Sequence, residues 1–189
     1  MRKIIFSFFT VAVLLASPVF AAGTYTIDPV HSTLGFSIKH MMVSNTTGQF
    51  DKYEGTIVYD PNDLANATVN VTIQADSIDT HMDQRDNHLR SPDFFDVAKN
   101  PTITFVSKQV TPSSITGDLT IKGITKEVSI PVEISGPVKS PSGDNVIGIS
   151  GTFKINRQDY GISFNKTMDQ GGLMVANDVT VNISVEAKQ

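Results

Sequence analysis

Residues of alternating polarity recur in segment after segment of this chain. In "STLGFSIKH", residues 32–40, Leu34, Phe36 and Ile38 occupy every second position, and small or polar residues lie between them. The same pattern returns in six further segments: 67–75, 102–110, 114–123, 126–135, 146–156 and 178–187. Because successive side chains of a strand point to opposite faces, strict alternation predicts antiparallel strands with one dry face and one wet face.

Turn-forming residues separate these segments. Pro, Gly, Asn, Asp and Ser gather at residues 60–63, 111–114, 122–123 and 139–144, and such residues favour turns. The short connection at Gly123 predicts a hairpin over residues 115–135. With about eight to ten strands and almost no helix to cover a sheet, the dry faces must meet each other. The sequence therefore predicts one all-β domain, either a sandwich or a closed barrel without exposed edges.

One stretch, "HLRSPDFFDVAKNP" at residues 88–101, departs from the alternation because it is charged and aromatic. Thr80 is placed to cap a short helix, with Asp83 three residues later as a variant of the capping box. Ser91 and Pro92 repeat the signals for a helix start, since Ser favours the cap and Pro the first helical position. We therefore expect a short helical insert of two turns near residues 81–96.

Two roles are open for this insert. In the first it is structural: Leu89, Phe94 and Phe95 cover one end of the dry interior, and Arg85 and Arg90 pair with nearby aspartates, namely Asp79, Asp86, Asp93 and Asp96. In the second it carries a site, because a guanidinium near the mouth of a barrel presents several donors in a planar fork to a ligand headgroup.

The N-terminus has the pattern of a secretory signal peptide. Arg2 and Lys3 precede an apolar run over residues 4–15, and small residues lead to Ala21. The run is shorter than the roughly 20 apolar residues that a membrane helix needs. We expect cleavage after Ala21, so that residues 1–21 are removed and residues 22–189 form the mature domain in the periplasm.

Charge and composition exclude several classes of function. Loss of Arg2 and Lys3 leaves 13 basic residues against 19 acidic ones, a net charge of −6. Nucleic acids and anionic membrane surfaces bind to basic patches, so neither is an expected partner, and no stable membrane insertion is expected. The chain contains no cysteine, which excludes thiol catalysis and thiolate metal sites.

The remaining polar residues do not compel a catalytic or metal site. His81 and His88 lie seven residues apart, which on a continuous helix would place them on roughly one face, but no short metal-binding spacing accompanies them. Ser91 lacks the glycine-flanked context of a nucleophile. We therefore expect no metal and no cofactor, and an enzyme that uses Arg85, His88, Arg90 and Asp93 remains the alternative.

Four long stretches carry a resemblance to a known family. They are "TYTIDPVHSTLGFSIKHM", "RDNHLRSPDFFDVAKNPTITF", "GDLTIKGITKEVSIPVEI" and "FKINRQDYGISFNKTMDQGGLMVANDVTVNISVEA". They resemble the YceI-like, polyisoprenoid-binding proteins over essentially all of residues 24–188. The resemblance implies an exported, lipocalin-like antiparallel barrel of eight strands that holds an amphiphilic isoprenoid, for example an isoprenoid quinone, in its interior. It does not imply a catalytic residue.

On this basis the protein is expected to carry, store or sequester an isoprenoid or other long-chain amphiphilic lipid. The residues expected at the ligand are those on the dry faces and in the insert: Phe36, Ile38, Ile73, Phe94, Phe105, Ile121, Phe153 and Arg90. The alternatives are an enzyme acting on an isoprenoid lipid or its headgroup, and an accessory protein that docks to a membrane redox partner. A homodimer remains open.

Overall fold

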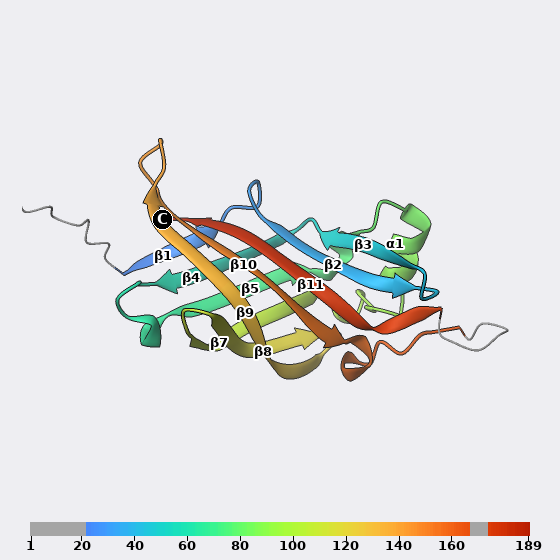
Figure 1. Ribbon diagram of the computed structural model, residues 1–189. Coiled ribbons are helices and arrows are strands. Elements are labelled where there is room, and N and C mark those ends of the chain that lie inside the picture. The colour runs from blue at the N-terminus through green and yellow to red at the C-terminus, as the bar shows by residue number, and fades with distance from the viewer. Residues whose placement is uncertain (1–21, 167–173) are drawn as a thin grey trace, which may run out of the picture.

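Eight antiparallel strands close into a barrel in the computed structural model, which describes residues 22–166 and 174–189 (Figure 1). The predicted signal peptide, residues 1–21, lies outside the described residues. The hydrogen-bonded ring returns from β11 to β1. In ring order its strands are β1 (Gly23–Ile27), β4 (Tyr53–Tyr59), β5 (Thr68–Gln74), β7 (Thr102–Val110), β8 (Ser114–Ile121), β9 (Ile124–Lys139), β10 (Asn145–Asn156) and β11 (Val175–Lys188).

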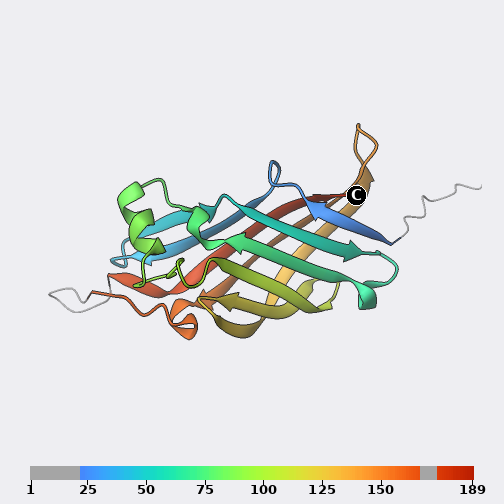
Figure 2. The same ribbon diagram turned by 180° about the vertical axis from the view of Figure 1, so that it is seen from behind.

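Three further strands extend one end of this ring. β2 (Thr33–His40) pairs with β11 beyond β1, β3 (Ser44–Phe50) pairs with β2, and β6 (Ile78–Asp79) pairs with β3. Within the described residues β6 has no pairing with β7. Helix α1 (Asp83–Arg90) and the turns that follow it connect these two strands (Figure 2). The insert therefore lies where the ladder is interrupted.

Other helical structure is short. Three 3-10 helices, η1, η2 and η3, span Leu64–Asn66, Ala75–Ser77 and Arg157–Tyr160. In the parts of the chain that the structure describes, none of the helices has the length and apolar character required to cross a bilayer.

The prediction of a closed all-β barrel is confirmed, and the seven alternating segments all form strands. The hairpin at Gly123 is also confirmed, with Lys122 and Gly123 both at positive φ. The predicted segments did not include β1, β3, β4 or β6. Of these, β3 has the sequence "SNTTGQF", which contains no apolar series. Gly48 of β3 lies under the Phe36 ring, so closely that an added Cβ would approach Phe36 Cζ to 2.6 Å. The Phe36 ring thus covers β3 at Gly48, and Phe50 is the apolar residue that this strand itself contributes to the interior.

The two ends of the barrel differ. In Figures 1 and 2 the C-terminus and β1 lie at one end, and α1 lies at the other. A buried cluster that includes Tyr25, Ile57 and Ile147 fills the first end. A second cluster, which includes Phe94, Ile121 and Tyr160, lies toward α1. We call the end with α1 the mouth and the opposite end the closed end.

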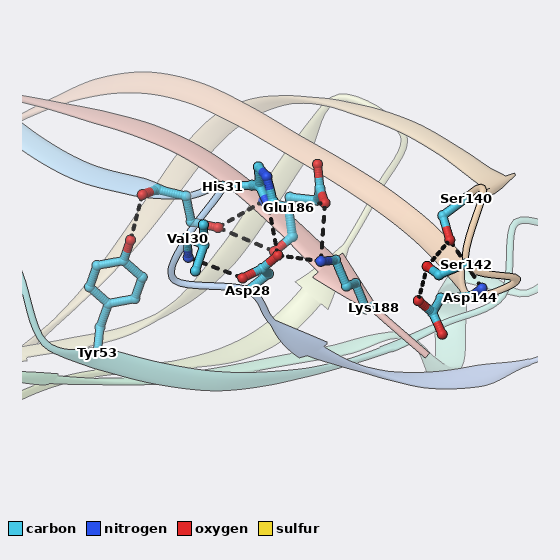
Figure 3. A network of polar contacts seen from close by, with 10 residues as sticks. Asp28, Val30, His31, Tyr53, Ser140, Ser142, Asp144, Glu186 and Lys188 are labelled. Atoms are coloured by element: carbon cyan, nitrogen blue, oxygen red, sulfur yellow. Dashed lines mark hydrogen bonds and ion pairs between the residues drawn. The ribbon is translucent and has the colours of Figure 1, made fainter.

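A polar network marks the seam between β1 and β11 near the closed end (Figure 3). The carboxylate of Asp28 accepts from the backbone N–H of Val30, lies 2.7 Å from Nδ1 of His31, and pairs with Nζ of Lys188 at 2.5 Å. The Asp28 amide also donates to the carbonyl of Glu186. Because these contacts favour the carboxylate, the hydrogen bond with His31 first among them, the pKa of Asp28 lies well below its ordinary value.

We expect Asp28→Asn to lower the melting temperature at pH 7, because the amide has no charge to pair with Lys188 and cannot accept as strongly. A depressed folded-state pKa contributes stability that is fully present above the unfolded pKa of about 3.9 and is lost as the pH falls through the folded value. The difference in melting temperature between wild type and variant should therefore stay constant from pH 7 to about pH 4 and shrink as the pH falls further.

Thermal unfolding followed by circular dichroism at several pH values measures this difference. Asp178→Asn, at an exposed position of β11, is the matched control and should have little effect. Equal effects of the two substitutions at pH 7 would show that the network does not hold the seam.

Candidate functional site

A cavity of about 440 Å³ occupies the barrel between the closed end and the mouth. Its wall is apolar over most of its extent, with side chains from the inner faces of β2, β5, β7, β8, β10 and β11. Of the eight residues expected at a ligand, seven line it: Phe36, Ile38, Ile73, Phe94, Phe105, Ile121 and Phe153. A volume of this size falls within the range of small-ligand sites, about 300–1,000 Å³. The barrel is thus not filled by its own side chains.

The polar part of the lining belongs to the segments at the mouth. It comes from the end of β2, from β3, from the insert with the residues before it, and from η3, and consists of His40, Thr46, Thr80, Arg85, His88, Arg157 and Tyr160. Arg157 and Tyr160 were not among the residues expected from the sequence. The sequence does contain a signal for Arg157. It follows Phe153 and Ile155 at intervals of two residues, so it lies on the same inward face as these two residues of β10.

Helix α1 begins later than the cap signal at Thr80 predicted. Its N-cap is Met82, without a capping side chain, and His81 is held in the left-handed region with φ of 61°. The hydroxyl and the amide of Thr80 both donate to the buried carboxylate of Asp86. Thr80 therefore stabilises the insert through a contact with the middle of the helix, and its assignment as the helix cap was wrong.

The second predicted helical turn, at Ser91 and Pro92, is a series of non-helical turns. The amides of Phe95 and Val97 donate to the carbonyls of Leu89 and Arg90, so the chain folds back on the end of α1 instead of starting a new helix. The folded-back segment places Leu89, Phe94 and Phe95 in the cavity wall, in agreement with the prediction that these residues cover one end of the interior.

The prediction that aspartates hold Arg85 and Arg90 was wrong, because backbone carbonyls hold both guanidinium groups. Arg85 donates from Nε to the hydroxyl of Thr80 and from Nη2 to its carbonyl, both at 2.6 Å. Arg90 donates from Nε to the carbonyl of Asp76 at 2.7 Å and from Nη2 to that of Ile78 at 2.8 Å. Arg90 thus ties the end of α1 to η2 and β6.

Arg90 does not line the cavity, in contrast to the expectation that it lies at the ligand. Its guanidinium group donates to the carbonyls of Asp76, before β6, and of Ile78, within β6, instead of extending into the cavity. Arg85 lies closer to the lumen and contributes to the lining. The expected aspartate partners bind elsewhere: Asp79 to His81, Asp86 to Thr80, Asp93 to His88 and Asp96 to Lys99.

His88 combines a polar and an aromatic environment at the mouth. Its Nε2 lies 2.9 Å from Oδ2 of Asp93. Its ring meets those of Phe94 and Phe164 edge to face, with centroids 5.0 and 4.8 Å away. Of the four residues in the enzyme alternative, Arg85 and His88 face the cavity and His88 contacts Asp93, while Arg90 is separated from them by its carbonyl contacts.

A second group of charged side chains, Asp28, His31 and Glu186, has donor atoms within 4.8 Å of one another, as metal ligands do. The ammonium of Lys188 already lies among these oxygens, 2.5 Å from Asp28 and 3.9 Å from Glu186. Because Lys188 supplies the positive charge that a cation would bring, the geometry is that of the ion-pair network at the seam (Figure 3).

The matched family model is described as the YceI-like domain and covers residues 25–187. The chain belongs to the YceI-like family. Among curated relatives, the UPF0312 proteins SAS2572 and SAR2769 of Staphylococcus aureus strains MSSA476 and MRSA252 are 45% and 46% identical over 163 residues, which cover 86% of this chain and 95% of each relative.

Solved structures share the fold of this YceI-like chain. BcnA of Burkholderia cenocepacia matches with a TM-score of 0.75 at 25% identity, over 85% of this chain and 98% of that one. The YCEI protein of Campylobacter jejuni matches with a TM-score of 0.68 at 34% identity, over 80% and 89% of the two chains. A polyisoprenoid binding domain from Saccharophagus degradans matches with a TM-score of 0.65 at 16% identity, over 87% and 97%.

A substitution of Arg90 can distinguish a structural role of its carbonyl contacts from a role in ligand binding in this YceI-like barrel. Arg90→Lys replaces a fork by a single ammonium that cannot reach both carbonyls, so we expect a loss of about 1–2 kcal/mol in unfolding free energy. The melting temperature should fall by several degrees, and the amount of co-purified lipid in the folded fraction should stay the same. An unchanged melting temperature together with reduced lipid would instead make Arg90 a ligand contact.

Proposed function

We propose that this protein is an exported carrier that holds an isoprenoid or similar long-chain amphiphilic lipid in its barrel, for transport, storage or sequestration. The observation that carries the proposal is the cavity, which is apolar along the barrel and polar only at the mouth. An amphiphile with one long tail and one polar head matches this distribution. The neighbour from Saccharophagus degradans is described as a polyisoprenoid binding domain, which supports the same class of ligand.

The apolar wall supports binding of a hydrocarbon chain on energetic grounds. Each carbon group that leaves water contributes about 0.8 kcal/mol at most, so a few isoprene units offset the entropy lost on binding. We assign contact with the tail to Phe36, Ile38, Ile73, Phe94, Phe105, Ile121 and Phe153. The aromatic members are concentrated in the half of the barrel toward the mouth, where they can pack against the first units of the chain.

The proposed export rests on the signal peptide pattern of residues 1–21. N-terminal sequencing of the protein recovered from a periplasmic fraction tests this part separately. A mature chain that begins at Ala22 would support export to the periplasm. Recovery of a full-length chain from the cytoplasmic fraction would contradict it without affecting the assignment of the cavity.

Organic extraction of the purified protein, followed by mass spectrometry, tests the carrier function. We expect about one chemically unchanged lipid chain per protein molecule, since the described barrel encloses a single apolar cavity that is closed at one end. The enzyme alternative is tested in parallel with an added isoprenoid pyrophosphate. Turnover of this compound that is lost in His88→Ala would contradict a carrier function and favour the enzyme, because His88 and Asp93 form the polar pair at the mouth.

Neighbouring residues of β7 provide a matched test of the cavity wall. Phe105 faces the cavity, and Val106 is 50% exposed on the outer face. Phe105→Asp places an unpaired charge in the apolar interior, and we expect a loss of about 3 kcal/mol or more in unfolding free energy, or an empty barrel. Val106→Asp should change stability by no more than about 0.5 kcal/mol and leave the lipid content intact.

Chemical denaturation and lipid extraction of both variants give the two measurements. If Phe105→Asp retains wild-type stability and lipid content, the inner face of β7 has been assigned to the wrong residues. Destabilisation by Val106→Asp to the same extent would lead to the same conclusion.

A further inference from the structure

Arg157 lies where the strand pattern calls for an apolar side chain. It follows Phe153 and Ile155 on the inner face of β10 and begins η3 at the mouth. Its side chain lines the cavity, yet the residue is only 4% exposed to solvent. A guanidinium buried in this way must find its hydrogen-bond partners within the protein or in a ligand.

Backbone carbonyls accept hydrogen bonds from two of the three nitrogens of the Arg157 guanidinium. Nε donates to the carbonyl of Ala176 at 2.9 Å, and Nη1 donates to the carbonyls of Ile162 and Phe164 at 2.9 and 2.8 Å. Nη2 is buried and has no hydrogen-bond partner among residues 22–166 and 174–189. Since Arg carries five N–H donors, the two on Nη2 are left for another group.

The charge of Arg157 is also uncompensated within the described chain. No carboxylate of these residues lies within ion-pair distance of it, and the described lining of the cavity contains two arginines and two histidines but no Asp or Glu. Burial lowers the pKa of Arg157 from its ordinary value, but a guanidinium in a protein keeps its proton at neutral pH. The described lining of the cavity at the mouth therefore carries positive charge without a carboxylate, although the insert around it contains several aspartates.

We propose that Nη2 of Arg157 binds an anionic oxygen in the headgroup of the ligand, a phosphate or a carboxylate, while the tail occupies the cavity. This inference rests on the proposed lipid-binding function. A neutral alcohol accepts a hydrogen bond but leaves the buried charge uncompensated, whereas an anionic oxygen supplies both an acceptor and the opposite charge. Three carbonyl contacts already fix the orientation of the fork, so little side-chain entropy is lost when the head binds.

The experiment compares geranylgeranyl phosphate with geranylgeraniol, which share one chain and differ in the head. Affinities are measured by competition with a fluorescent lipid on the full mature protein. We expect wild type to bind the phosphate at least about tenfold more tightly, as a charge-assisted hydrogen bond predicts. Arg157→Met should reduce this preference to less than about twofold and leave the affinity for the alcohol unchanged.

Arg90→Met is the matched control, because Arg90 also binds carbonyls near the mouth but does not line the cavity. It should keep the preference for the phosphate. Because Arg157 also binds three carbonyls, its substitution can impair folding. Guanidinium NMR resonances of wild type therefore provide a second measurement. The solvent-protected signals of Arg157 should shift on addition of the phosphate and change less with the alcohol.

Equal affinity of wild type for both probes, or a phosphate preference that survives in Arg157→Met, would overturn the assignment of Arg157 and leave the lipid-binding barrel in place. Unchanged guanidinium resonances in the presence of bound phosphate would overturn it as well. Failure of wild type to bind either probe would overturn the proposed function itself.

Discussion

The architecture depends on β11, because this strand closes the barrel. One of its edges pairs with β10 over nearly its whole length, and the other pairs with β2 near the mouth and with β1 near the closed end. The pairing of β11 with β1 closes the ring of eight strands and turns every second side chain toward a common interior. From β11 the sheet therefore continues as two series of strands. Near the closed end the order is β1, β4, β5, and at the mouth it is β2, β3, β6. At the mouth the ladder ends with β6, and the helical insert covers the interruption.

The insert thereby determines what the interior can hold. A fully paired barrel of eight strands is narrow enough for its own side chains to fill, and the closed end is filled in this way by Tyr25, Ile57 and Ile147. Toward the mouth, α1 and the following turns supply Leu89, Phe94 and Phe95 to the wall. Arg85 and Arg90 of α1 bind the carbonyls of Thr80 and Ile78 and so tie the helix to the end of the interrupted ladder. An apolar cavity and a polar rim follow from this arrangement.

The alternation of polarity predicted seven of the strands, but not β1 and β4, although both place buried apolar side chains in the core. Alternation placed Phe36, Ile73, Phe105 and Phe153 on the inner face, and each lines the cavity. It did not identify β3, because Gly48 there packs under Phe36 and provides no hydrophobic signal of its own. Alternation of polar and apolar residues detects a strand by its own buried apolar side chains. It therefore misses a strand that, like β3 at Gly48, is covered by an aromatic residue of the neighbouring strand.

Local signals in the insert were less reliable, because each has more than one physical outcome. A threonine before an acidic helix start is a common cap, but the hydroxyl of Thr80 donates to Asp86, and His81 in a left-handed conformation delays the helix. Aspartates close in sequence to Arg85 and Arg90 suggested ion pairs. Carbonyls that are distant in sequence from Arg90, those of Asp76 and Ile78, bind it instead. Backbone acceptors have no signature in the sequence, so these partners appear only in the structure.

Arg90 and Arg157 differ in what satisfies the N–H donors of their guanidinium groups. Arg90 is partly exposed, so water can satisfy the donors that its carbonyl partners do not use. Arg157 has similar carbonyl partners, but it lies in the cavity lining with almost no exposure to solvent, and its Nη2 has no partner among the described residues. The same side chain therefore acts as a structural fork in one position and as a group that requires a ligand in the other. What decides between the two is the access of water to the last unpaired nitrogen, rather than the residue type or its distance from the mouth.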